Sequence, residues 1–237
     1  MDSTLLINSI NRKQPTSSVS DKENRYLAEV YKDFSAQKKE NRYIQLLHPC
    51  SVTSKSSHSG AILPPISLAY LAATLRGAGY PVKIIEAQGD DIFKIRLSEC
   101  GDYNIQGLST EEIIARIKPE TKILGVTLLY SYEWLIQRDV IKAIKARFPK
   151  IIIVVGGEHP TALPEYVLRD CPEVDFIVSG EGEFTLLQLV SSIFYSKEFR
   201  SIPGISYINK KGQFASNGLS SRIAHIDDIP RPAWDLC

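Results

Sequence analysis

Two glycine-containing turns, each placed between an apolar segment and a helical pattern, constrain this chain more than any other feature. Residues 151–155 are all β-branched and apolar, and they lead into the pair Gly156–Gly157. A second apolar segment, 174–178, leads into the glycine-rich turn 180–182 and then into a helical pattern. Successive strand–turn–helix units predict a parallel α/β sheet whose strands end at one edge. Because ligands of open α/β sheets bind at this edge, the pattern locates a candidate site before its ligand is known.

The same alternation of strand and helix patterns runs through most of the chain. It predicts a doubly wound α/β fold with a five-stranded parallel sheet and helices on both faces. The strands are expected at 43–48, 82–87, 122–127, 151–155 and 174–178, and the helices at 66–75, 109–118, 132–148, 163–169 and 183–195. Residues 203–216, with Asn209-Lys-Lys-Gly212 at their centre, predict a β-hairpin. The segment 51–59 is expected to be a solvated Ser-rich loop, and 88–108 an irregular connection.

Changes in composition divide the chain into three parts. Residues 1–42 are polar and weakly patterned, with one possible helix at 21–39, and are expected to be a partly ordered extension or a disordered leader. Residues 43–200 carry the α/β pattern. Residues 201–237 contain the hairpin and a proline-punctuated tail that is expected to be a linker toward a further domain.

Composition narrows the class of protein. The 237 residues carry a formal net charge of +1, with 43% hydrophobic and 23% charged residues and no basic cluster, so nothing predicts a nucleic-acid partner. No apolar stretch approaches the ~20 residues of a membrane span. The four cysteines are widely spaced and show no metal-ligand spacing, which is typical of reduced thiols. These features predict a cytoplasmic protein without a membrane segment.

Several ligands would suit the predicted edge. At Gly156–Gly157 a ligand can approach the backbone closely, although a tight turn without a ligand is the alternative. The segment Gly180-Glu-Gly182-Glu-Phe-Thr185 begins like a dinucleotide fingerprint, but Thr185 occupies the place of the third glycine. A receiver domain is excluded because His48-Pro49 and Thr127-Leu128 stand where its magnesium-binding carboxylates would be. A flavin or nucleotide protein of flavodoxin type stays open.

No catalytic set of side chains is evident in the sequence. Nothing pairs a serine or cysteine nucleophile with a histidine and a carboxylate. His159 is the histidine expected closest to a ligand, and His48 is expected to line the same cleft. His58 and His225 are expected in loops. A structural, hydrogen-bonded role is the default for each of them.

Four motifs, in order, resemble the N-terminal cobalamin-binding domain of cobalamin-dependent radical SAM enzymes. They are Pro64-Pro-Ile-Ser-Leu-Ala-Tyr-Leu-Ala-Ala-Thr-Leu-Arg-Gly-Ala-Gly-Tyr80, Gly156-Gly-Glu-His-Pro-Thr161, Asp175-Phe-Ile-Val-Ser-Gly-Glu-Gly-Glu-Phe-Thr185 and Ile202-Pro-Gly-Ile-Ser-Tyr207. The segment Asp227-Asp-Ile-Pro-Arg-Pro-Ala-Trp-Asp235 is similar to the linker that precedes the radical SAM barrel in that family. The resemblance covers about residues 43 to 236.

The resemblance implies a flavodoxin-like, Rossmann-type sheet that holds the corrin over the carboxyl ends of its strands. It implies that the cofactor is cobalamin and that the enzyme is a methyltransferase or of the cyclase type. The residues expected to contact cobalamin are Pro64, Pro65, Thr127, Leu128, Tyr130, Gly156, Gly157, His159, Pro160, Thr161, Gly180, Glu181, Gly182 and Glu183. Among them, Thr127, Tyr130, His159, Thr161 and Glu181 are expected to bond the corrin's amide side chains.

The sequence lacks two motifs of related cobalamin and radical SAM proteins, and both absences affect the role expected of the chain. The chain has no Asp-x-His motif of the kind that ligates cobalt in methionine synthase, so base-off binding without a histidine or any other metal ligand is expected. The Cys-x-x-x-Cys-x-x-Cys triad of radical SAM enzymes is also missing. The [4Fe–4S] cluster and S-adenosylmethionine are therefore expected only in a barrel supplied in cis or in trans, and the chain alone is not expected to be catalytic. The main alternative is a scaffold module of the same fold that binds no cofactor.

Overall fold

The computed structural model describes residues 42–57, 63–220 and 222–237. The possible helix at 21–39 lies outside these residues, as does nearly all of the polar extension. The predicted strands and helices alternate along the described chain, as follows: β1 (Tyr43–His48), α2 (Ile66–Gly77), β3 (Val82–Glu86), α3 (Thr110–Arg116), β6 (Thr121–Thr127), α4 (Trp134–Arg147), β7 (Ile152–Gly156), α5 (Glu158–Ala162), α6 (Pro164–Asp170), β8 (Phe176–Val178) and α7 (Gly182–Tyr195). The short helix α5 is the one element of this series that the sequence pattern did not indicate.

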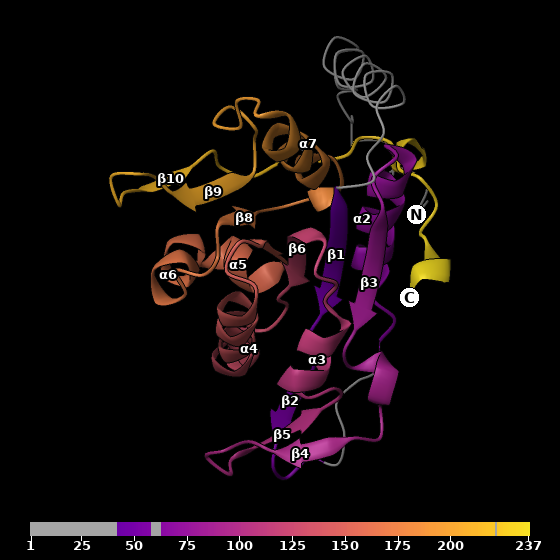
Figure 1. Cartoon of the computed structure of the whole chain (residues 1–237), viewed down its shortest axis with the longest axis vertical. Helices are drawn as coiled ribbons and strands as arrows, with labels where there is room; N and C mark the ends of the chain where they lie inside the picture. The colour runs from indigo at the N-terminus through magenta and orange to yellow at the C-terminus, as the bar shows by residue number, and fades with distance from the viewer. Residues whose placement is uncertain (1–41, 58–62, 221) are drawn as a thin grey trace, which may run out of the picture. The chain divides into compact units, whose positions relative to one another are not determined.

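The main sheet has seven strands in the order β10-β9-β8-β7-β6-β1-β3 (Figure 1). Its five predicted strands are parallel to one another, and in chain order they run 2-1-3-4-5, which is the flavodoxin-like arrangement. The predicted hairpin, β9 (Ile205–Ile208) and β10 (Phe214–Ser216), is present and pairs antiparallel with β8. The α/β prediction is confirmed, and the sheet is larger than predicted because the hairpin extends it.

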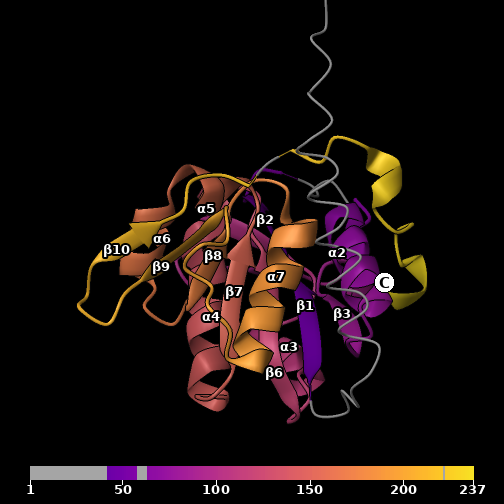
Figure 2. The same ribbon diagram turned by 90° about the horizontal axis from the view of Figure 1, so that it is seen from above.

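Helices cover both faces of the sheet (Figures 1 and 2). On one face, α3, α4 and α6 pack on buried strand residues such as Leu47, Leu124 and Val155. On the other face, α2 packs against β1, β3 and α7. The helix α2 is nearly all apolar because it is buried in this layer, as its sequence indicates. The order β3-β1-β6-β7-β8 brings the ends of β6, β7 and β8 together at one edge of the sheet.

A second, three-stranded sheet corrects two predictions. The Ser-rich segment contains β2 (Ser51–Ser54), and the connection contains β4 (Ile95–Leu97) and β5 (Tyr103–Gln106), in the antiparallel order β2-β5-β4. These strands are three or four residues long, too short to show a periodic pattern, and they form only because they pair with distant segments. Since β2 follows β1 after two residues, this sheet lies beyond the carboxyl ends of β1 and β3 (Figure 1).

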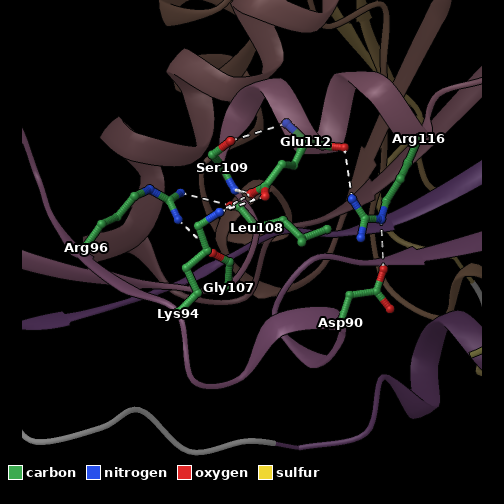
Figure 3. Close-up of polar contacts among 8 residues, drawn as sticks. All are labelled: Asp90, Lys94, Arg96, Gly107, Leu108, Ser109, Glu112 and Arg116. Carbon is green, nitrogen blue, oxygen red and sulfur yellow. Dashed lines mark hydrogen bonds and ion pairs between the residues drawn. The ribbon is translucent and has the colours of Figure 1, made fainter.

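Polar contacts attach the small sheet to α3 (Figure 3). Arg96 donates from its two terminal guanidinium nitrogens to the carbonyl oxygens of Gly107 and Leu108, at 2.7 and 2.9 Å. Lys94 Nζ lies 2.6 Å from a carboxylate oxygen of Glu112, which also closes the capping box with Ser109 at the start of α3. The Lys94 ammonium and the Ser109 backbone lower the pKa of the Glu112 carboxyl to about 2.

The C-terminal tail packs on α2. The backbone N–H of Ala233 donates to the carbonyl oxygen of Ala69 at 3.0 Å, and Arg76 lies 2.6 Å from Asp235. Ala233 is fully buried. The tail therefore contacts the α/β core over its last residues, and it contains the short helical turns η4 (Ile226–Asp228) and η5 (Trp234–Leu236). None of the described helices is both long and apolar enough to cross a membrane.

Candidate functional site

A cavity of about 260 Å³ opens where α2 and α7 meet the carboxyl ends of the parallel strands. We call it the first cavity. Most of its wall is apolar and comes from strand and helix side chains that are close in space and distant in sequence. The lining residues are Leu46, Ser67, Leu68, Leu71, Gly125, Val126, Thr127, Leu129, Val154, Val155, Gly156, Gly157, Glu158, Val178, Gly180, Glu181, Gly182, Glu183 and Leu186.

Small residues keep the first cavity open. Gly125 is the one glycine within β6, and a Cβ atom there would lie 2.7 Å from the Leu46 side chain. A Cβ atom on Gly182, at the start of α7, would lie 3.3 Å from Leu71 on α2. Both glycines therefore let a neighbouring leucine pack directly against the backbone, which leaves the space beyond the leucine free. The result is a slot with apolar walls between a sheet and two helices, a common place for a ligand.

Three carboxylates line the first cavity, those of Glu158, Glu181 and Glu183. Burial raises the pKa of the Glu183 carboxyl, and the nearby Glu181 adds to this effect. Glu181 is held by the C-terminal segment: its carboxylate accepts a hydrogen bond from the backbone N–H of Ile223, and its carbonyl accepts one from Ser220 Oγ at 2.9 Å. The rim is thus acidic, and part of it is fixed by a segment some 40 residues away in sequence.

The turn at Gly157 is required by the protein's own backbone. Gly157 has φ +109°, and a Cβ atom there would lie 2.4 Å from the carbonyl oxygen of Leu128. Leu128 in turn donates its N–H to the carbonyl of Gly156 at 2.8 Å. The glycine therefore lets the ends of β6 and β7 approach each other, which is a different reason from the close approach of a ligand that the sequence suggested. Gly156 and Gly157 nevertheless both line the first cavity.

His159 lies inside the protein. It is 3% exposed, and burial lowers its pKa. Its Nδ1 lies 2.9 Å from Ser131 Oγ, its ring packs on Trp134, and its Nε2 has no hydrogen-bond partner among the described residues. The side chain lines neither cavity, and its contacts connect α5 to the turn that follows β6.

A second cavity, of about 290 Å³, lies beside the first at the ends of β1 and β6. Thr127 and Leu129 line both cavities, so together they form the wall between them. The second cavity is lined by His48, Pro49, Cys50, Ser51, Thr53, Leu63, Gln88, Thr127, Leu129, Tyr130, Tyr132, Glu133 and Gln137. Its lining is richer in polar groups, several of which are buried.

Two carboxylates belong to the environment of the second cavity. Glu133 is 5% exposed, and burial raises the pKa of its carboxyl. Its two oxygens accept hydrogen bonds from the backbone N–H of Val52 at 2.9 Å and from Gln137 Nε2 at 3.0 Å. His48 Nδ1 lies 2.7 Å from the carboxylate of Glu86, which belongs to β3. No group of three metal-ligating side chains occurs in residues 42–57, 63–220 and 222–237.

The two cavities bring together eight of the fourteen residues predicted to bind the cofactor. Thr127, Gly156, Gly157, Gly180, Glu181, Gly182 and Glu183 line the first cavity, and Thr127 and Tyr130 line the second. The other six line neither cavity. Pro64 and Pro65 precede α2, Leu128 is buried below the edge, and His159, Pro160 and Thr161 lie within α5.

Sequence reasoning missed the apolar walls and most of the polar cavity. Leu46, Leu68, Leu71, Val154 and Leu186 read as core residues, because nothing local distinguishes a side chain that faces a cavity from one that is fully packed. Glu133 and Gln137 fall in the helix expected at 132–148, and the sequence pattern assigns them no role. Their spacing could have indicated a shared site, because the two residues lie one helical turn apart, soon after the predicted strand end.

The chemistry that this arrangement supports is binding. An apolar slot next to a polar pocket suits a ligand that has a flat hydrophobic part and several amide or hydroxyl groups. Leu63, Ile66, Tyr130, Tyr132 and Leu135 are exposed apolar or aromatic residues close to this edge, and the Tyr130 and Tyr132 rings are stacked. The described side chains around the cavities do not combine into a nucleophile–base pair.

Comparison with known proteins gives a family match. A model described as "B12 binding domain" matches residues 56–190. An uncharacterized methyltransferase of Pyrococcus horikoshii is 32% identical over 179 residues, which are 75% of this chain and 35% of that protein. An anaerobic magnesium-protoporphyrin IX monomethyl ester cyclase of Rubrivivax gelatinosus is 28% identical over 177 residues, which are 73% of this chain and 29% of the cyclase. The chain spans about a third of the length of these relatives.

A solved structure shares the fold. It is that of the cobalamin-dependent S-adenosylmethionine radical enzyme OxsB with aqua-cobalamin and S-adenosylmethionine bound. The match has a TM-score of 0.63 at 20% sequence identity, and it covers 81% of this chain and 24% of that one. The flavodoxin-like architecture predicted from the sequence is therefore confirmed.

Proposed function

The chain belongs to the B12-binding domain family, and we propose that it holds cobalamin base-off at the carboxyl edge of its sheet, as the cofactor-holding part of a radical SAM system. The main support is the first cavity, an apolar slot that runs from the sheet edge down between α2, α7 and the strands. In this proposal the cofactor's nucleotide tail occupies that slot, and the corrin ring lies over the exposed residues of the edge.

The residues present fit cobalamin. Its aromatic base is flat and largely apolar, and the leucines and valines of the first cavity offer matching walls with a polar rim at Thr127, Glu181 and Glu183. A bulky apolar ring would also cover Leu129 and the stacked Tyr130 and Tyr132. The chemistry that cobalamin supplies when bound is the carriage of a methyl group on cobalt. The chain's own contribution is to bind the cofactor, orient it and keep water away from its buried face.

Absence of a histidine ligand is part of the proposal. Two histidines lie near the edge, and both are engaged by the protein: His159 contacts Ser131 and Trp134, and His48 contacts Glu86. We propose that His159 is a positioning residue, which fixes the turn 128–132 between the two cavities. A base-off state leaves the nucleotide free to enter the first cavity, which agrees with the shape of that slot.

The remaining predicted contacts are proposed on the outer side of the edge. Pro64 and Pro65 precede α2, whose residues Leu68 and Leu71 line the first cavity. Pro160 and Thr161 follow the Gly156–Gly157 turn in α5, and Leu128 holds that turn through its backbone. We propose that the exposed Pro64 and the half-buried Thr161 contact the corrin rim, and that the buried Pro65 and Pro160 shape the backbone that the rim meets.

The catalytic partner is proposed from the relatives. A radical SAM barrel, in cis or in trans, would hold the [4Fe–4S] cluster and S-adenosylmethionine and would carry out methyl transfer or a cyclase-type reaction. The exposed Ile66 and Leu135 beside the cavities are consistent with an edge that a cofactor and a second domain cover.

Cobalamin binding to the purified chain tests the proposal. The chain is mixed with hydroxocobalamin, desalted and examined by visible spectroscopy, and retention of the corrin spectrum is expected. After reduction to cob(II)alamin, electron paramagnetic resonance should show no nitrogen splitting from an axial ligand. Nitrogen splitting that disappears in His48→Ala would contradict the absence of a histidine ligand, whereas splitting from the cofactor's own base would contradict the base-off part. A colourless protein with an intact fold would contradict the cofactor role and favour a scaffold module.

A further inference from the structure

One residue that lines the second cavity has a buried acceptor without a hydrogen-bond partner in the described part of the chain. Gln137 is 3% exposed, and its Oε1 atom has no hydrogen-bond partner among the described residues. Its Nε2 donates to Glu133 Oε2 at 3.0 Å, which fixes the orientation of the amide. A buried carbonyl oxygen without a donor costs free energy, so such atoms in native proteins point to a missing partner.

The surroundings of Gln137 are rigid. Glu133 lies one helical turn earlier, and its other oxygen accepts a hydrogen bond from Val52 in the small sheet at 2.9 Å. Lys94, next to β4, contacts Glu112 of α3, and Arg96 of β4 holds the Gly107–Leu108 segment that leads into α3 (Figure 3). The Gln137 amide is therefore held in place before any ligand binds, which lowers the cost of ordering it on binding.

The residues that line the second cavity favour a neutral ligand group that can both donate and accept hydrogen bonds. Glu133 already accepts hydrogen bonds from the Val52 N–H and from Gln137 Nε2, and burial raises the pKa of its carboxyl, so this cavity disfavours a buried charge. Hydroxyl donors from Ser51, Thr53 and Tyr130 line the same cavity. A primary carboxamide combines an N–H₂ donor for Gln137 with a carbonyl acceptor for such a hydroxyl.

We propose that the second cavity is a subsite for a primary carboxamide arm of the corrin, with Gln137 Oε1 as its acceptor. This inference rests on the proposed function, because the corrin periphery carries such amides. The two cavities share Thr127 and Leu129 and are therefore neighbours, so one large ligand can reach both. A ring whose tail enters the first cavity would place one edge over the second.

Cobalamin monocarboxylates test the subsite without altering the protein. In each isomer one peripheral amide is replaced by a carboxylate, which cannot donate to Gln137 and is repelled by Glu133. One isomer should bind the wild-type chain about tenfold more weakly than cobalamin does, because it loses a buried hydrogen bond. Equal affinity of every isomer and of cobalamin would overturn the subsite.

Variants of Gln137 make the test specific. Gln137→Met keeps the side-chain length and removes the acceptor, so it should bind cobalamin about tenfold more weakly. Gln137→Lys should reverse the preference and favour the monocarboxylate that wild type rejects. The matched control is Gln213→Lys, on the exposed hairpin turn, which should leave all affinities unchanged. Circular dichroism checks that each variant folds.

The outcomes separate this inference from the proposed function. If the wild-type chain retains cobalamin but Gln137→Met binds it equally well, the subsite fails and the cofactor role stands. If the wild-type chain retains no cobalamin, both fail. A folding defect in Gln137→Met leaves the decision to the monocarboxylate series on the wild-type chain.

Discussion

The two cavities at the sheet edge are similar in size, about 260 and 290 Å³, but opposite in construction. The first lies between two layers of apolar side chains and is kept open by glycines. The second lies between the two sheets, and hydrogen bonds of Glu133, Gln137 and Val52 form part of its wall. An apolar cavity selects its occupant by shape, whereas a polar one selects by the pairing of donors and acceptors. The comparison therefore predicts different responses to substitution.

Filling the first cavity should have the largest effect. Leu71 lines it from α2, where it is half-buried, so Leu71→Trp can place a larger ring in the slot. We expect cobalamin affinity to fall by about 100-fold or more, on the order of 3 kcal/mol, because the nucleotide tail loses its site. Cobinamide, which has no nucleotide, should bind as it does to wild type. Titration monitored by visible absorbance measures both.

The control for Leu71→Trp is Tyr70→Trp, the neighbouring position on α2, which lines neither cavity. This variant should keep the preference for cobalamin over cobinamide. An equal loss of cobalamin and cobinamide in Leu71→Trp would mean that the first cavity does not hold the tail.

Disturbing the turn at Gly157, which packs against Leu128, should have the next largest effect. Gly157→Ala combines a left-handed φ of +109° with a contact of 2.4 Å to the Leu128 carbonyl, so the ends of β6 and β7 must separate. We expect a loss of about 1–3 kcal/mol in the free energy of unfolding and weaker binding of both cobalamin and cobinamide. Chemical denaturation measures the first quantity.

Gly212→Ala is the matched control for strain without a clash. Gly212 also has a positive φ, +74°, but a Cβ atom there would meet nothing within 4 Å. It should therefore be less destabilising than Gly157→Ala and should leave binding unchanged. Equal stability losses in the two variants would show that the contact with Leu128 contributes nothing.

The second cavity should respond most weakly, through the pH dependence of stability. Burial raises the pKa of Glu133 above its ordinary value of 4.5, so the folded state binds this proton more tightly than the unfolded state. Its favourable contribution is then present below pH 4.5 and is lost as the pH rises through the folded pKa. Relative to Glu133→Gln, the wild-type chain should become less stable over that rise.

Thermal melts of wild type and Glu133→Gln across this pH range measure whether their stability difference changes with pH in the expected direction. The exposed Glu99, which lines neither cavity, offers the matched control Glu99→Gln. The groups that interact with Glu133 include His48, Cys50, Tyr132, Gln137 and the Val52 N–H, and all are shared by the two proteins. If wild type instead gained stability relative to Glu133→Gln as the pH rises, the folded protein would favour the ionised form of Glu133.

Much of the fold could be predicted because it depends on local patterns. The β-branched strand 151–155, the apolar helix at 66–75 and the capping box at Ser109 each carry their own signal, and the structure has them. The small sheet could not be predicted, since Ser51–Ser54 becomes a strand only by pairing with Tyr103–Gln106. The same limit applies to His159, whose burial depends on contacts with Ser131 and Trp134.

The sequence by itself determined which edge of the sheet carries the site, because strand–turn–glycine patterns are local and parallel strands end together. It also determined the resemblance that led to the family. The tertiary structure alone decided that this edge is divided into an apolar and a polar cavity. That division depends on Leu46 and Leu71 packing closely against Gly125 and Gly182, and on Val52 reaching Glu133. Such contacts join residues that are far apart in the chain, and no local pattern encodes them.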